Sequence, residues 1–109
     1  MESILTSIKK QLGITEDYEA FDLDVITAIN SVFMTLNQIG VGTPKPFSIK
    51  DKTAVWSDFI GTEDYEAVKS YVYLKTRLLF DPPQSSSVID AMERMASEYE
   101  WRLNIAAES

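Results

Sequence analysis

All four prolines of this chain occur in two short clusters, and these clusters limit where a helix can run. Pro44 and Pro46 flank Lys45, and Pro82 and Pro83 follow Asp81. Proline has no backbone N–H and its ring clashes with the preceding helical turn, so a helix interior excludes it. A helix therefore has to end before each of the two clusters.

Between these breaks, apolar residues recur at helical spacing. The clearest segment places Val25, Ile29 and Phe33 on one face, as expected for an amphipathic helix. Asp22 is placed to cap the start of this helix, and Gly40 follows its end. The periodicity predicts helices over residues 2–12, 25–39, 62–80 and 88–103, with one or two helical turns at 53–60.

We therefore predict an all-α fold, a small bundle of about four helices with one Pro/Gly-containing loop over residues 40–52 and a short extra helical turn. A chain of 109 residues is expected to form a single domain over 1–109. The apolar faces of the last two helices predict core positions at Val68, Tyr71, Val72, Leu74, Leu78, Leu79, Val88, Ile89, Met92, Ala96, Tyr99 and Leu103.

The six-residue string TEDYEA occurs twice, at residues 15–20 and 62–67. The sequences that follow the two copies diverge, and two copies are fewer than a solenoid needs. We interpret the repeat as the same helix-start chemistry used twice, because acidic residues favour the positive end of a helix.

The residue types of most catalytic and metal sites are missing. The chain has no His and no Cys, which removes the commonest general base and the thiolate metal ligand. None of the four glycines belongs to a phosphate-binding loop. We expect no enzyme activity, no metal and no cofactor. Without a long apolar run or a signal peptide, we also expect no membrane association. The absence of cysteine fits a reducing cytoplasm.

The net charge of −7 argues against binding to nucleic acid, since that affinity comes from neutralising phosphates with Lys and Arg. The charge is uneven along the chain. Residues 1–40 and 81–109 each hold six acids and two bases, whereas residues 41–80 hold five acids and six bases. Solvated surface is the ordinary explanation of such unevenness.

Several side chains do not fit the face on which helical spacing places them. Lys75 falls within the apolar face of the third helix. Either its aliphatic stem packs on this face while its ammonium group reaches water, or the ammonium group pairs with a carboxylate of a neighbouring subunit. Tyr73 and Phe80 fall on the opposite side. Trp101 points away from the apolar face of the last helix, where the 41–60 segment or a partner protein would cover it.

Two segments resemble a known family. They are residues 68–83, with the sequence VKSYVYLKTRLLFDPP, and residues 92–104, with Met92-Glu93 followed by EYEWRLN at 98–104. With the two N-terminal helices, they resemble the head–tail connector (adaptor) proteins of long-tailed double-stranded DNA phages and prophages. The resemblance covers nearly the whole chain and rests on patterns of helices and helix ends.

The resemblance implies a structural subunit at the head–tail junction of the virion, present in the host bacterial cytoplasm before assembly. Such subunits form a ring of about a dozen copies below the portal protein, in some cases only on the portal. The ring extends the DNA channel, through which DNA passes without specific binding, and offers a platform to the tail or stopper protein. The family has no active site to transfer.

A ring needs a contact between two unlike surfaces of neighbouring subunits. The sequence offers a basic group at Lys45, Lys50 and Lys52. It also offers an uninterrupted acidic group at Glu16, Asp17, Glu19, Asp22 and Asp24. Tyr73, Lys75, Phe80 and Trp101 complete the candidate interface. Two alternatives are a small helical regulatory adaptor with a single partner, and a tail-completion structural protein.

Overall fold

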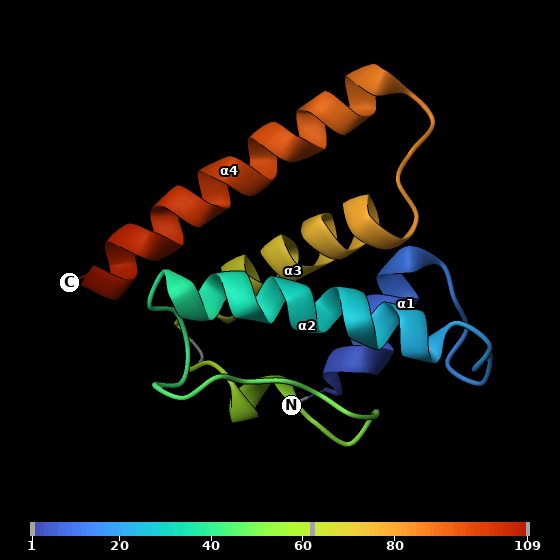
Figure 1. Ribbon diagram of the computed structural model, residues 1–109, viewed down its shortest axis with the longest axis horizontal. Helices are drawn as coiled ribbons and strands as arrows, with labels where there is room; N and C mark the ends of the chain where they lie inside the picture. The colour runs from blue at the N-terminus through green and yellow to red at the C-terminus, as the bar shows by residue number, and fades with distance from the viewer. Residues whose placement is uncertain (1, 62, 109) are drawn as a thin grey trace.

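The computed structural model describes residues 2–61 and 63–108, and within them the chain is all-helical (Figure 1). The elements are α1 (Ile4–Leu12), α2 (Asp22–Gln38), a short 3-10 helix (Trp56–Asp58), α3 (Tyr65–Phe80) and α4 (Ser86–Glu108). The described residues contain no strand, only an isolated antiparallel bridge between Ser3 and Val55. The predicted fold class is therefore confirmed.

The helices end where local chemistry stops them. Ser3 Oγ accepts a hydrogen bond from the Thr6 N–H at the start of α1, and Gly13 closes that helix with a positive φ of 83°, which glycine adopts without strain. Gly40, with a φ of 86°, follows α2. The Asp81-Pro82-Pro83 cluster follows α3 as predicted.

Two predicted helix starts are wrong. Asp22 does not cap α2, because it is the first helical residue and the cap position belongs to Phe21, which makes no side-chain cap. The third helix begins at Tyr65, and Thr62 lies outside the described residues. The first TEDYEA copy therefore precedes α2 as a loop, while the second copy enters α3 after Asp64.

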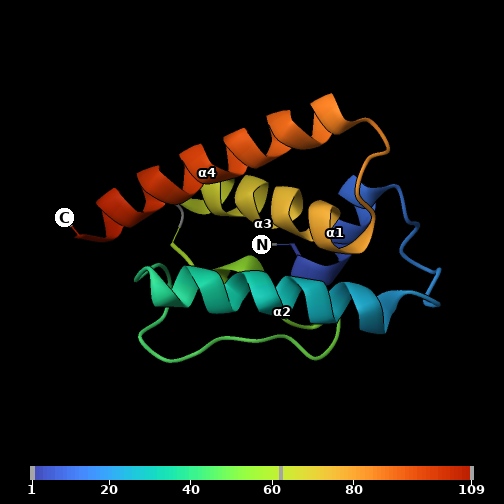
Figure 2. The same cartoon turned by 45° about the horizontal axis from the view of Figure 1, so that its top comes forward.

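The helices and one long segment form successive layers. α3 lies between α2 and α4, and the segment 41–55 runs along the far side of α2 (Figure 2). The predicted apolar positions Val25, Ile29 and Phe33 of α2 are all fully buried. α2 therefore contributes a continuous buried face to the core.

Trp56, which follows the 41–55 segment, contributes its side chain to the core. Its side chain is fully buried, and its ring lies 6.3 Å from that of Phe33 and 6.1 Å from that of Tyr65. The indole Nε1–H donates to Ser7 Oγ at 2.8 Å, so the polar atom of the ring is satisfied. Because Ile4 N–H also donates to Ala54 O at 3.0 Å, the N-terminus and the segment hold each other.

The last helix buries few of its residues, and part of its predicted core face is wrong. Only Ala96 and Leu103 of α4 are buried, while Val88 is 46% exposed. At the end of α3, Leu79 is likewise exposed instead of buried, and Thr76 occupies the core. α4 crosses α3 at an angle (Figure 1), so its ends cannot stay in contact with the same face.

The two tryptophans should differ sharply in their contribution to stability. Trp56→Ala is expected to lower the free energy of unfolding by about 3–5 kcal/mol, because it removes a buried aromatic side chain. Trp101→Ala should change it by no more than about 0.5 kcal/mol, since Trp101 is 65% exposed. Urea unfolding followed by circular dichroism measures both values, and equal losses would contradict this assignment.

Candidate protein interface

The lysine-containing loop is anchored to α2 by two asparagine side chains. Asn30 and the backbone of Ile49 exchange two hydrogen bonds, of 3.0 and 2.8 Å. Asn37 Nδ2 donates to the carbonyls of Thr43 and Lys45. The side chains of Lys45, Lys50 and Lys52 are exposed. The predicted basic group therefore lies on an ordered loop.

The acidic group lies on a different loop, residues 13–21, which a buried lysine holds in place. Lys9 Nζ donates to the carbonyls of Glu16 (3.1 Å) and Tyr18 (2.8 Å) and lies 2.7 Å from Asp22 Oδ1. Its side chain is only 3% exposed. One ammonium group thus satisfies two loop carbonyls and the first carboxylate of α2.

The ion pair between Lys9 and Asp22 separates Asp22 from the other carboxylates of the predicted acidic group. Asp22 belongs to the ion pair with Lys9 and drops out of the predicted acidic group. Glu16, Asp17, Glu19 and Asp24 are exposed. None of these four forms an ion pair within 4.0 Å inside the described part of the chain. Sequence reasoning missed Lys9, although a lysine flanked by the apolar residues of an amphipathic helix was a visible signal.

Aromatic rings continue from the acidic loop to the end of α3. Phe21 lies 5.6 Å from Tyr18 and 5.6 Å from Phe80, measured between ring centroids. Tyr18 and Phe21 are exposed, and Phe80 is half-buried. The predicted Phe80 is thus joined to the acidic loop, and both Tyr73 and Phe80 are half-buried and pack against the main core.

Lys75 and Trp101 have separate environments. Lys75 is half-buried in a groove between α3 and α4 that Glu93 and Glu100 also line, and it forms no ion pair within 4.0 Å in the residues described. Trp101 is exposed on α4, so the 41–60 segment does not cover it. Both residues stay available to a partner.

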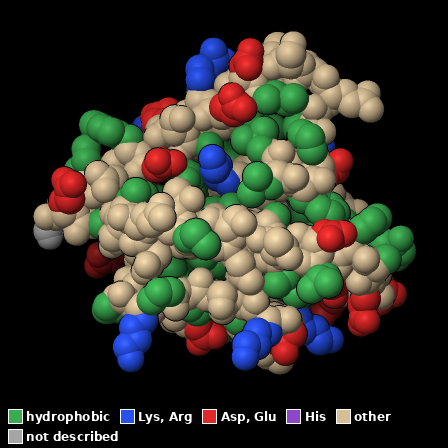
Figure 3. Space-filling model, in the orientation of Figure 1, with side chains coloured by type: hydrophobic (Ala, Val, Ile, Leu, Met, Phe, Trp, Pro, Cys, Tyr) green, Lys and Arg blue, Asp and Glu red, His purple; other side chains and the backbone are tan. Residues whose placement is uncertain are grey.

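The surface of the molecule reflects these placements. In the face shown in Figure 3, lysine and arginine side chains project from the lower edge, and carboxylates lie at the lower right below hydrophobic side chains at the right edge. The basic group lies on the 41–52 loop, whereas Glu16, Asp17 and Glu19 of the acidic group lie on the 13–21 loop. The chain therefore presents unlike surfaces.

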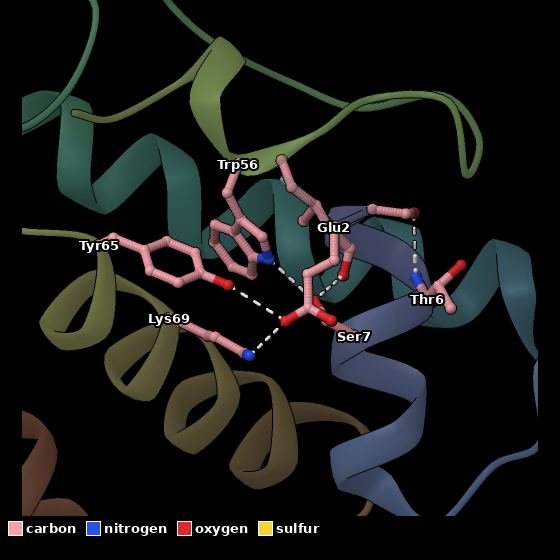
Figure 4. Close-up of polar contacts among 8 residues, drawn as sticks. Glu2, Thr6, Ser7, Trp56, Tyr65 and Lys69 are labelled. Atoms are coloured by element: carbon pink, nitrogen blue, oxygen red, sulfur yellow. Dashed lines mark hydrogen bonds and ion pairs between the residues drawn. The ribbon is translucent and has the colours of Figure 1, made fainter. Parts of the chain in front are cut away.

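A polar cluster fixes the first residues to α3. The Glu2 carboxylate accepts hydrogen bonds from Lys69 Nζ and from the Tyr65 hydroxyl (Figure 4). The bond from Lys69 lowers the pKa of Glu2 below 4.5, and burial together with Glu2 raises the pKa of Tyr65. Tyr71 donates to Glu100 at 2.8 Å, and burial is the main cause of its raised pKa. The bonds of Glu2 tie the N-terminus to α3, and the bond from Tyr71 to Glu100 ties α4 to α3.

The described residues hold no group of three or more His, Cys, Asp or Glu side chains placed to bind a metal ion. No helix within residues 2–61 and 63–108 is long and apolar enough to cross a membrane. The structure presents exposed apolar and charged side chains on its helices and on loops held by hydrogen bonds. These features are those of a helical protein-binding subunit.

Comparison with known families identifies the subunit more closely. The family model described as "Phage connector protein" matches residues 4–109, so the chain belongs to the phage connector family. No curated protein and no solved structure matches the chain. The resemblance found in the sequence is thereby confirmed. The protein has a structural role in phage particles, which its all-helical fold suits.

Removing the Lys9 ammonium should loosen the acidic loop. We expect Lys9→Met to lower the free energy of unfolding by about 1–3 kcal/mol, the cost of leaving buried acceptors without a partner. Amide exchange in residues 13–21 should rise further than exchange in α3. Lys10→Met is the control, since Lys10 is exposed. Unchanged exchange in the loop would show that Lys9 does not hold it.

The Glu2 cluster should make stability depend on acidic pH. Because the folded pKa of Glu2 is lowered, its contribution is fully present above its ordinary pKa of 4.5 and is lost as the pH falls through the folded value. Glu2→Gln should therefore unfold more easily than the parent chain at pH 7, and the difference should shrink below pH 4.5. Urea unfolding at several pH values measures it, and a constant difference would contradict this assignment.

Proposed function

We propose that the protein is a ring-forming subunit of the phage head–tail junction. In this proposal the ring lies below the portal protein, extends the DNA channel and offers a docking platform to the tail or stopper protein. The observation that carries the proposal is the connector family match over residues 4–109. It is supported by the exposed apolar side chains on α4, among them Trp101, which a subunit surrounded by partners would cover.

The charge of the chain suits a channel. DNA has to slide through the ring without being held, and a net charge of −7 leaves few groups able to neutralise phosphates. Lys45, Lys50 and Lys52 are the local exception, and they lie on the loop that we assign to protein contacts. Before assembly the subunit would reside in the bacterial cytoplasm.

The candidate interface residues divide into two roles in this proposal. The basic and acidic loops set the register between neighbouring subunits, because complementary charges steer and orient association. Trp101 supplies affinity, since exposed aromatic side chains are the usual anchors of interfaces. Lys75 pairs with a carboxylate of a neighbouring subunit.

The proposal is tested by co-expression with the portal protein of the same phage, followed by electron microscopy. We expect closed rings of about a dozen copies on the portal. Trp101→Ala should weaken ring formation while the helical content stays that of the parent chain.

Two results would overturn the proposal. A chain that stays monomeric with the portal and binds one regulatory protein would be an adaptor. A chain that binds the tail protein and ignores the portal would be a tail-completion protein. In both cases the ring assignment fails.

A further inference from the structure

One exposed segment of the lysine loop has an ordered backbone. Pro44, Lys45 and Pro46 are all exposed, while Asn37 Nδ2 holds the Lys45 carbonyl from α2 and Thr43 Oγ1 donates to the same carbonyl at 2.9 Å. The two prolines restrict the backbone further. Docking this segment would therefore cost little conformational entropy.

A shallow groove of about 440 Å³ lies between α2 and α3. Leu79 and Phe80 form its α3 side, and the exposed carboxylate of Asp24 lies on its α2 side. The Phe80 ring continues to Phe21 at 5.6 Å, so the groove has an aromatic wall. Thr27, Ala28 and Ser31 complete its lining, and their small side chains leave room for a bound chain.

We infer that the Pro44-Lys45-Pro46 segment of one subunit docks into the α2–α3 groove of the next. The Lys45 ammonium pairs with Asp24, and the prolines pack on Leu79 and Phe80. Proline-containing segments bind aromatic-lined grooves elsewhere because their extended shape is preformed. The inference rests on the proposed function, since it names the surfaces that neighbouring copies share.

Charge favours a second copy of this chain as the occupant. Glu16, Asp17 and Glu19 lie on the loop before α2, and Lys50 and Lys52 follow Lys45 on the other surface. None of these charges has an ion-pair partner within 4.0 Å among residues 2–61 and 63–108. Three lysines would thus meet an acidic rim that includes Asp24.

The two surfaces cannot meet within one chain. Asp24 lies near the start of α2, whereas Lys45 is held by Asn37 near its end. At 1.5 Å per residue, the thirteen positions from Asp24 to Asn37 span about 20 Å. The contact is therefore head-to-tail between copies, which is the type of contact that closes rings.

The test uses the absence of cysteine from the chain. In the double variant Asp24→Cys/Lys45→Cys, each subunit carries one thiol on each surface, and a disulfide within one chain is out of reach at about 20 Å. Rings formed with the portal protein and then oxidised should give a ladder of covalent oligomers on a non-reducing gel. Each single variant should remain monomeric on the gel.

The control is Met95→Cys/Lys45→Cys, which moves the first thiol to the exposed Met95 on α4. A ladder in this control, or dimers from either single variant, would overturn the inference. Rings visible by electron microscopy without a ladder would overturn the inference and leave the proposed function standing. If the parent chain forms no ring on the portal, the proposed function fails and this contact fails with it.

Discussion

The burial of Trp56 is the constraint on which the rest of the structure depends. Helices α1, α2 and α3 leave one side of their shared core open, and the Trp56 side chain closes it, with its N–H bonded to Ser7. Because Trp56 is fixed in the core, the segment that precedes it packs across α2. The same segment forms backbone hydrogen bonds with the N-terminal residues. A loop that contains two prolines thereby gains a fixed position without regular structure of its own.

That fixed position links the core to the assembly surfaces. Asn30 and Asn37 hold the lysine loop from one side of α2, and Lys9 holds the acidic loop at the start of the same helix. Buried or half-buried polar groups therefore order the two loops that we propose to meet between neighbours. Because both loops are ordered before contact, assembly would lose less conformational entropy than the joining of two flexible loops.

α4 has the smallest share of buried residues of the four helices and carries the exposed tryptophan, Trp101. Ala96 and Leu103 are the buried residues of α4, and the hydrogen bond from Tyr71 to Glu100 ties this helix to α3. The other faces of α4 leave Val88, Met95 and Trp101 exposed. In the proposed ring, Trp101 would supply affinity between neighbouring copies, whereas the loops at α2 would set their register.

The sequence by itself determined the all-helical class, the stops of the first three helices and the apolar face of α2, because periodicity, glycine and proline act over a few residues. Only the tertiary structure decided the rest. The two TEDYEA copies show why: Tyr18 is exposed in a loop that Lys9 holds, whereas Tyr65 begins α3 and packs near Trp56. Likewise, Trp56 is core and Trp101 is surface. Local sequence cannot separate such cases, because partners distant in the chain supply the contacts that decide burial.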